Sequence, residues 1–284
     1  MVRAVVEAPG RVRSKEHFPS VFSRHALAYQ QRLEDIMSRG ESAGRMRALE
    51  LLDAGPGMKV LDLACGPGTL SRRLVTAVSP GGEVTGVDLA PGMIELARAL
   101  DLPSARFELM DIEQLAFADD AFDAAICGHG LQLVSDLPGA LREARRVLRP
   151  GGKLCASVPI GSYGEAVWVQ LYAVIDRWVP PAPEPVDQAA TRVTVQDADA
   201  LRQAAVDAGF VSAAVELIEE EVMWASAEQL VKGFMGWVDC AARTEGMDEI
   251  RRQAIMDEAI ATLSKDHPGR IVTKGGNHVL LAVA

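Results

Sequence analysis

The residues with the clearest chemical potential lie in the run VLDLACGPGTL at positions 60–70. Asp62 follows short apolar residues, and Gly66 and Gly68 come next, one residue apart, before a helical pattern begins. Glycine lets the backbone approach a ligand closely, and the unpaired N–H groups at the start of a helix favour negative charge. The pattern therefore predicts a strand, a tight turn and a helix that bind a nucleotide-like group, with Asp62 placed to meet an ammonium.

Two further acids end apolar segments downstream of this turn. Asp88 lies where a carboxylate can accept hydrogen bonds from both hydroxyls of a ribose, as acidic residues do in dinucleotide-binding folds. Asp111 lies where a carboxylate can accept an adenine amino proton while Ile112 packs on the ring. The alternative for each acid is structural, because an Asp at the end of a strand also caps the following helix.

Regularly alternating elements must position these residues. The sequence favours strands at 59–64, 83–88, 106–110, 122–127 and 153–158, and helices at 70–78, 93–100 and 137–148. The strands carry few alternating polar residues, which is typical of a sheet covered by helices on both faces. Repeated strand and helix units predict a parallel sheet with right-handed crossovers, so the ligand should lie beyond the carboxyl ends of the strands.

The segments on either side of this core have a different character. Residues 1–18 lack periodicity and are expected to form a mobile arm. The pattern then predicts an amphipathic helix at 21–37 and a second one at 45–52. Beyond residue 159 we expect helices at 160–179 and 197–208, a strand at 213–223, mostly helical chain at 226–264 and a final strand at 278–284.

Composition argues against several classes of protein. The 284 residues carry a formal net charge of −10 with a pI near 5.1, so the chain lacks the basic surface that holds a nucleic acid backbone. No run reaches the roughly 20 apolar residues that span a bilayer. The cysteines have no Cys-x-x-Cys spacing, which is typical of buried thiols in a reducing compartment: Cys65, Cys127, Cys155 and Cys240. We therefore expect a soluble, cytoplasmic protein that holds no metal.

Five ordered motifs resemble those of the class I S-adenosylmethionine (SAM) dependent methyltransferases, and specifically the small-molecule branch of ubiquinone and menaquinone biosynthesis. The motifs are the glycine turn at 62–68, Gly86-Val-Asp88 followed by Met93, Asp111-Ile112, Phe122-Asp123, and the segment from Arg146 to Gly152. The likeness covers residues 20–160 well and the remainder weakly. A nicotinamide-binding fold is disfavoured, because Ser71 stands where its fingerprint needs Gly or Ala and Asp62 would crowd a pyrophosphate.

The resemblance implies a Rossmann-like α/β sheet of seven strands, the last one antiparallel, with N-terminal helices and an inserted helical lid. It divides the chain into four parts. These are the mobile N-terminal arm (1–18), N-terminal helices that cover the cofactor (19–56), the SAM-binding core (57–160), and the lid helices with the remaining strands (161–284).

The resemblance also implies a cofactor site. Its residues are Tyr29, Asp62, Ala64, Cys65, Gly66, Gly68, Asp88, Leu89, Met93, Asp111, Ile112, Gly128 and His129. Tyr29 is expected near the methionyl part of SAM, where a ring face attracts a sulfonium, and core packing is its alternative. His129 follows the fourth strand, and we expect it to contact SAM or the acceptor. Roles for His129 as a general base or as a purely structural residue stay open.

The implied reaction is in-line methyl transfer from SAM, with S-adenosylhomocysteine (SAH) as the product. The acceptor is expected to be an oxygen, nitrogen or activated carbon of a hydrophobic or aromatic small metabolite, as in secondary metabolism, because the segments 160–179 and 224–240 are apolar and aromatic. A second hydrophobic core or a dimer contact explains the residues of these segments equally well. Two alternatives stay open: a cyclase or decarboxylase of the same fold that keeps SAM as a bound cation, and a non-catalytic SAM-binding subunit. A homo-oligomer is also left open.

Overall fold

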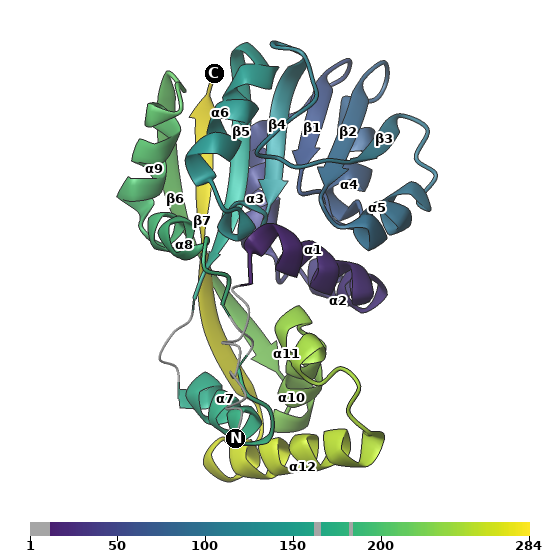
Figure 1. Cartoon of the computed structure of the whole chain (residues 1–284), viewed down its shortest axis with the longest axis vertical. Helices are drawn as coiled ribbons and strands as arrows, with labels where there is room; N and C mark the ends of the chain where they lie inside the picture. The colour runs from purple at the N-terminus through teal and green to yellow at the C-terminus, as the bar shows by residue number, and fades with distance from the viewer. Residues whose placement is uncertain (1–11, 162–165, 182–183) are drawn as a thin grey trace, which may run out of the picture.

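The computed structural model describes residues 12–161, 166–181 and 184–284. Its centre is a seven-stranded sheet in the order β3-β2-β1-β4-β5-β7-β6 (Figure 1). Neighbouring strands are parallel except where β7 pairs with β5 and β6. The strands are β1 (Lys59–Leu63), β2 (Glu83–Asp88), β3 (Ala105–Leu109), β4 (Phe122–Gly128), β5 (Leu148–Ile160), β6 (Ser212–Trp224) and β7 (Ile271–Val283). The predicted α/β sheet with its last strand antiparallel is confirmed.

Apolar side chains alternate between the two faces of this sheet, so that helices pack on both. Leu61 and Ala125 belong to one core, whereas their neighbours Val60 and Ala124 belong to the other. The first face is covered by α6 (Leu137–Val147), α8 (Ala189–Gln196) and α9 (Ala198–Asp207). The second is covered by α2 (Ala26–Ser38), α3 (Ala43–Leu52) and α4 (Thr69–Val78), with α5 (Pro91–Arg98) beside β2 and β3.

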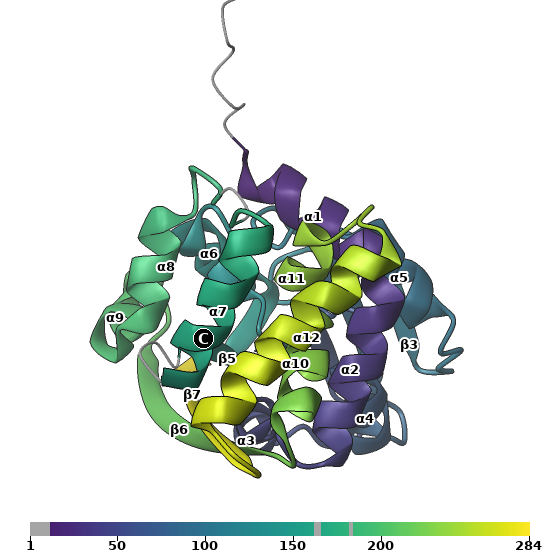
Figure 2. The same ribbon diagram turned by 90° about the horizontal axis from the view of Figure 1, so that it is seen from below.

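The strands β6 and β7 continue beyond the rest of the sheet and carry a second group of helices (Figures 1 and 2). These are α7 (Ala166–Trp178), α10 (Ala227–Met235), α11 (Val238–Arg243) and α12 (Glu249–Asp266), which share a hydrophobic core of their own. They occupy the part of the chain where we expected an inserted lid, and we call them the lid helices. Within the residues that the structure describes, no helix is long and apolar enough to cross a membrane.

The N-terminal chain differs from its prediction. We expected a mobile arm over 1–18 followed by one helix at 21–37, whereas α1 (Ser14–Arg24) and α2 are two helices that meet at His25. The expected arm is therefore wrong for the residues from Ser14 onward. Residues 1–11 lie outside the described residues.

Contacts far along the chain explain this difference. Pro19 is typical of a break in a helix, yet it lies inside α1. The helix is held by distant partners: the Ser14 N–H donates to Asp187 Oδ1 at 2.9 Å, and the Gly92 N–H donates to Ser23 Oγ at 3.2 Å. Such long-range contacts leave no signal in the local sequence.

Two later elements also differ from the prediction. The short helix α8 was not predicted, and it is separated from α9 by Asp197, whose side chain accepts the Ala200 N–H at 2.8 Å as an N-cap. β7 begins at Ile271, well before its predicted start, because Gly276 continues the ladder instead of forming a turn. A Cβ at Gly276 would lie 3.1 Å from Ile160, so glycine permits close packing of the strands there.

Candidate functional site

The backbone of the turn after β1 is exposed to a cavity at Gly66. Ala64, Gly66 and Gly68 have φ angles of 52°, 55° and 82°, in the left-handed region that favours glycine. The Cys65 N–H donates to Val87 O at 2.9 Å, which fixes the turn against the end of β2. A Cβ built on Gly66 would meet only Tyr29 Cε1, at 4.0 Å. The backbone at Gly66 is therefore free for close approach by a ligand.

A cavity lies above this turn, at the carboxyl ends of β1, β2 and β4, and we call it the strand-end cavity. Helices α1 and α2 cover it with Phe18, Phe22 and Tyr29. Most of the predicted site residues line it: Tyr29, Ala64, Gly66, Asp88, Leu89, Met93, Asp111, Ile112, Gly128 and His129. The strand ends thus bring together residues that are far apart in the sequence, as expected for a parallel sheet.

Asp88 both shapes the turn and faces the cavity. Its Oδ2 accepts the Gly66 N–H at 2.9 Å, and its Oδ1 accepts the Ala90 N–H at 2.8 Å. Burial raises the pKa of this carboxyl above its ordinary value despite these hydrogen bonds. The structural alternative for Asp88, a contact with the start of the following helix, is therefore also present. The same carboxylate accepts the Ala90 N–H and lines the cavity.

Asp62, Cys65 and Gly68 do not reach the cavity wall, although the sequence predicted them there. Asp62 is 1% exposed and accepts the Ser71 hydroxyl at 2.6 Å, and burial raises its pKa to about 7. Cys65 packs in an apolar cluster behind the turn, and a Cβ on Gly68 would lie 2.8 Å from Leu100. Asp62, Cys65 and Gly68 point toward α4 and α5, so they support the turn on the side away from the cavity.

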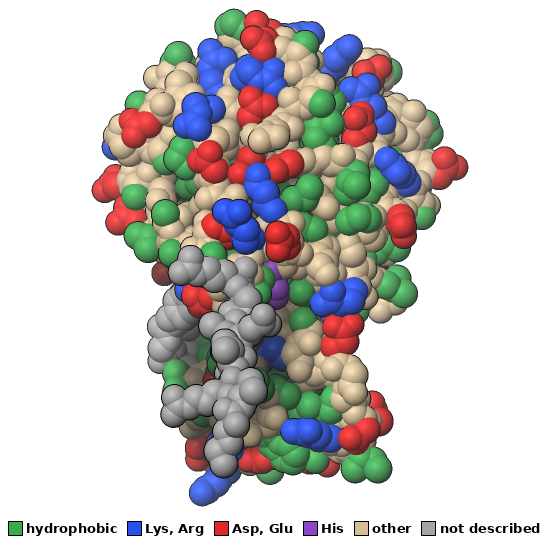
Figure 3. Space-filling model, in the orientation of Figure 1, with side chains coloured by type: hydrophobic (Ala, Val, Ile, Leu, Met, Phe, Trp, Pro, Cys, Tyr) green, Lys and Arg blue, Asp and Glu red, His purple; other side chains and the backbone are tan. Residues whose placement is uncertain are grey.

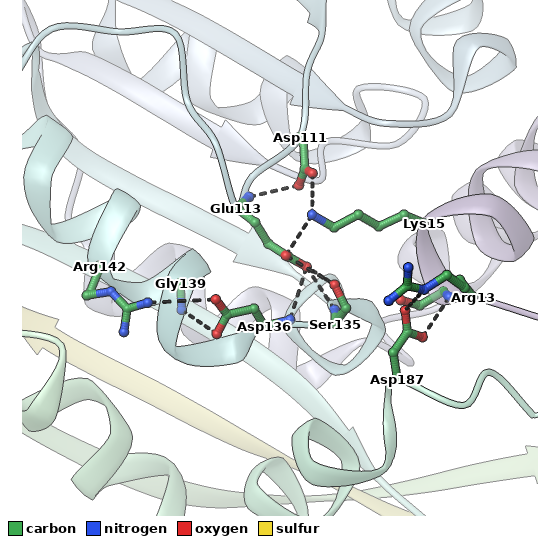
Figure 4. A network of polar contacts seen from close by, with 10 residues as sticks. Arg13, Lys15, Asp111, Glu113, Ser135, Asp136, Gly139, Arg142 and Asp187 are labelled. Carbon is green, nitrogen blue, oxygen red and sulfur yellow. Dashed lines mark hydrogen bonds and ion pairs between the residues drawn. The ribbon is translucent and has the colours of Figure 1, made fainter.

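A second acidic group lies at the far end of the strand-end cavity and is tied to α1 (Figure 4). Lys15 Nζ lies 2.6 Å from Asp111 Oδ2 and 2.7 Å from Glu113 Oε2. Burial alone would raise the pKa of Glu113, but hydrogen bonds from Lys15 and Ser135 hold it below its ordinary value. Lys15 was not among the predicted site residues, because it falls within the expected arm.

His129 stands between β4 and the lid in an unusual backbone conformation, with a φ of 67° that L-residues rarely adopt. The ring Nε2 lies 2.7 Å from Asn277 Oδ1 on β7, and the backbone N–H of His129 donates to Ser157 O at 2.9 Å. Burial, and secondarily the cation of Arg45, lowers the pKa of His129 well below its ordinary range. The imidazole is therefore neutral at physiological pH.

A second cavity of about 860 Å³ lies between α2, the lid helices and the extended ends of β6 and β7, and we call it the lid cavity. Its walls include Trp168, Trp224 and Trp237. The molecule narrows at this level, between its upper and lower lobes (Figure 3). The lid cavity and the strand-end cavity share Phe22, Tyr29, His129 and Leu133 as lining residues, so they meet at this junction.

Arg45 is a buried cation beside the junction and was not among the predicted site residues. Its guanidinium donates to the Tyr29 hydroxyl at 3.5 Å and to Ser42 Oγ at 3.2 Å, and the residue is only 8% exposed. Among the residues with described coordinates, no carboxylate forms an ion pair with it. A buried guanidinium without an acid is a position where a ligand anion would be stabilised.

These side chains fit a SAM molecule. Asp88 and Asp111 offer carboxylate acceptors, the turn at Gly66 offers open backbone, and Arg45 offers a cation for a carboxylate. The neutral imidazole of His129 places no charge where a sulfonium would be repelled. In the described parts of the chain, no group of three or more His, Cys, Asp or Glu residues is arranged to hold a metal ion.

Comparison with known proteins gives consistent matches. Residues 60–152 match the family model described as a methyltransferase domain. The chain is 38% identical over 168 residues to 2-phytyl-1,4-naphtoquinone methyltransferase of Synechococcus elongatus, which covers 57% of this chain and 72% of that protein. It is 33% identical over 171 residues to demethylmenaquinone methyltransferase of Staphylococcus aureus, which covers 59% of this chain and 70% of that protein.

A solved structure supports the fold. The YcgJ protein of Bacillus subtilis matches with a TM-score of 0.55 at 17% identity, over 85% of this chain and 97% of that one. Some sequence matches are shorter: the chain spans 33% of a Streptomyces fradiae transposon protein and 61% of the 2-phytyl-1,4-naphtoquinone methyltransferases of Trichormus variabilis and a Nostoc species. What the whole chain acts on must therefore be inferred from its own site.

Proposed function

The chain belongs to the class I SAM-dependent methyltransferases of the quinone-biosynthesis type, and on this premise we propose that it methylates a small hydrophobic or aromatic metabolite at oxygen, nitrogen or activated carbon. The observation that carries the proposal is the junction at Tyr29 and His129, where the strand-end cavity opens into the larger, aromatic lid cavity. A methyl donor in the first cavity and an acceptor in the second would face each other there.

We assign the strand-end cavity to the nucleoside part of SAM. Asp88 would accept from the ribose hydroxyls, because a carboxylate oxygen that already takes one N–H still has a second lone pair. Asp111 would accept from the adenine amino group, with Ile112 against the ring. The open backbone at Gly66 would lie beneath the amino-acid part.

We assign the carboxylate of the methionyl part to Arg45. Its guanidinium is buried and donates a hydrogen bond to the Tyr29 hydroxyl. It also lies close to Gly128, because a Cβ built at Gly128 would be 3.6 Å from Arg45 Nε. Tyr29 also faces Gly66, so the arginine and the glycine turn would hold the same end of the cofactor. This contact is an addition to the set that the sequence predicted.

The proposed chemistry asks the protein mainly to align two partners and to exclude water. SAM supplies an electrophilic methyl group on a sulfonium. Helices α1 and α2 cover one partner and the lid covers the other, and such alignment supplies about 7–11 kcal/mol in favourable cases. His129 is neutral, and with Asn277 Oδ1 accepting its Nε2–H, the lone pair on Nδ1 is the one that would take a proton from the acceptor.

Methyl-labelled SAM and a panel of aromatic metabolites test this function, with products read by mass spectrometry. We expect one acceptor class to gain a labelled methyl group as SAH forms. An acceptor that is isomerised or decarboxylated without gaining the label would support a cyclase or decarboxylase instead. Binding of SAM without turnover of any acceptor would support a non-catalytic subunit.

We place this reaction in the cytoplasm. Cys65, Cys127, Cys155 and Cys240 are all free and buried in the structure, which is the state expected for thiols in a reducing compartment. The proposed partners are SAM and the small acceptor.

A further inference from the structure

Most of the charged side chains that line the lid cavity already have partners. The paired cations are Arg39 with Asp35 and Glu41, Lys232 with Glu228, and Lys274 with Glu221. Of the acids, Glu220 accepts the Gly44 N–H at 2.9 Å and Asp239 lies 3.8 Å from Arg243. Arg39, Lys232 and Lys274 are therefore already paired, so none of them offers a free positive charge to a ligand.

Arg32 differs from these cations. Its Cζ lies 4.6 Å from the centroid of the Trp237 ring, and across the described ranges no carboxylate forms an ion pair with it. Burial, together with the nearby cations Arg45 and Arg39, lowers the pKa of Arg32 to about 10, so it stays charged at neutral pH. Stacking on an aromatic face holds a guanidinium while leaving its N–H groups free to donate at the edge.

We propose that Arg32 is the anion-binding residue of the acceptor site, and that the acceptor is a flat aromatic molecule that carries a carboxylate. The inference rests on the proposed function, since it takes the lid cavity as the place of the acceptor. The fork of N–H donors on a guanidinium matches a carboxylate bidentately. A half-buried cation without an acid costs free energy, and a ligand carboxylate recovers it.

The surroundings of Arg32 fit the rest of such a molecule. Trp168 and Trp224 form part of the apolar wall of the same cavity, although most of each indole is packed in the core of the lid helices. His129 lies at the end of the cavity that meets the cofactor, so a ring anchored by its carboxylate at Arg32 can present another atom to the junction. Arg45 is separate in this assignment, because we place it at the cofactor.

Equilibrium binding to the SAH-saturated protein tests the anion site without requiring turnover. The probes are 1-hydroxy-2-naphthoate and its primary amide, which have nearly the same shape but differ in charge. We expect the wild type to bind the acid at least about tenfold more tightly than the amide, as for other hydrogen bonds to charged groups. Arg32→Gln should reduce this preference to less than about twofold, by weakening the acid alone.

Two further variants sharpen the test. Lys232→Gln removes a cation from the same cavity that is already paired with Glu228, so it should keep the preference for the acid. Arg45→Gln should weaken SAH itself. An unchanged SAH affinity in Arg32→Gln shows that this variant is folded. The anion site is overturned if the wild type does not prefer the acid, if neither probe binds, or if the preference survives Arg32→Gln.

Labelled SAM separates this inference from the proposed function. Acid-selective binding without methyl transfer to any acceptor would leave the anion site in place and overturn the methyltransferase assignment. Methyl transfer to neutral and acidic acceptors with equal KM would support the methyltransferase assignment and overturn the anion site. Both proposals stand together if Arg32→Gln raises the KM for acidic acceptors and leaves kcat at saturation unchanged.

Discussion

At the scale of single residues, Asp88 combines two tasks in one carboxylate. It holds the turn through Gly66 and the start of α5 through Ala90, and it lines the strand-end cavity. These tasks are compatible because each carboxylate oxygen has two lone pairs. The same residue therefore connects the local geometry of the turn with the proposed recognition of the ribose.

Asp88→Asn keeps the size of the side chain but removes its charge and one acceptor. We expect the affinity for SAM to fall at least about tenfold, since hydrogen bonds to charged groups contribute about 1.5–3 kcal/mol. Calorimetric titration with SAM measures this. Asp199→Asn makes the same change at a side chain that is 97% exposed on α9, and it should bind SAM as the wild type does. Retained affinity in Asp88→Asn would contradict the ribose assignment.

The raised pKa of Asp62 predicts how the free energy of unfolding of the SAM-free protein depends on pH. Burial raises its pKa from 3.8 to about 7. The folded state therefore keeps a proton that the unfolded state releases, so the stabilisation is complete below the unfolded pKa and is lost as the pH rises through 7. Asp62→Asn cannot titrate. The thermal midpoint of the wild type minus that of the variant should fall between pH 4 and 7 and then level off. A difference that is constant with pH would refute the raised pKa.

At the scale of elements, Lys15 ties α1 to the acids at the far end of the strand-end cavity. Lys15→Met should let this cover open more often, so we expect SAM to dissociate about two- to fivefold faster, the range for a partly exposed ion pair. Stopped-flow displacement measures the rate. High salt should speed release from the wild type but not from the variant. Lys265→Met, on the distant helix α12, serves as the control. Equal rates in Lys15→Met and the wild type would show that these ion pairs do not hold the cover.

The elements that could be predicted are those whose determinants are local. β2 has the predicted bounds, because a run of small and apolar residues ends at Asp88. α1 could not be predicted, because Ser14 and Lys15 are held by partners far along the chain. The start of β7 was hidden in the same way, since the role of Gly276 depends on Ile160 across the sheet.

The site follows the same division. Asp88, Asp111 and His129 were predictable because parallel strands deliver their carboxyl ends to one edge. Arg32 and Arg45 lie on amphipathic helices, where a cation ordinarily faces solvent, and only the packing of these helices against the lid and the sheet encloses them. Asp62 was placed on the correct strand, but the direction of its side chain depends on Ser71.

At the scale of the whole molecule, the sheet and the lid helices have separate hydrophobic cores. The core of the sheet lies behind the strand-end cavity, whereas the lid helices pack in a separate cluster around residues such as Leu230 and Leu263. Among the described residues, the two cavities share Phe22, Tyr29, His129 and Leu133 and meet there. Damage to one core should therefore affect the binding of one ligand more than that of the other.

Leu263→Ala tests this separation. The side chain is fully buried in the lid core, and its truncation should cost about 2–5 kcal/mol, which loosens α12 and the walls of the lid cavity. We expect weaker binding of 1-hydroxy-2-naphthoate with an unchanged affinity for SAM, both measured by calorimetry. Leu141→Ala makes the same truncation in the sheet core and should weaken SAM as well. If Leu263→Ala weakens SAM as much as Leu141→Ala does, then the lid and the sheet respond as one unit and the two cavities are not separately supported.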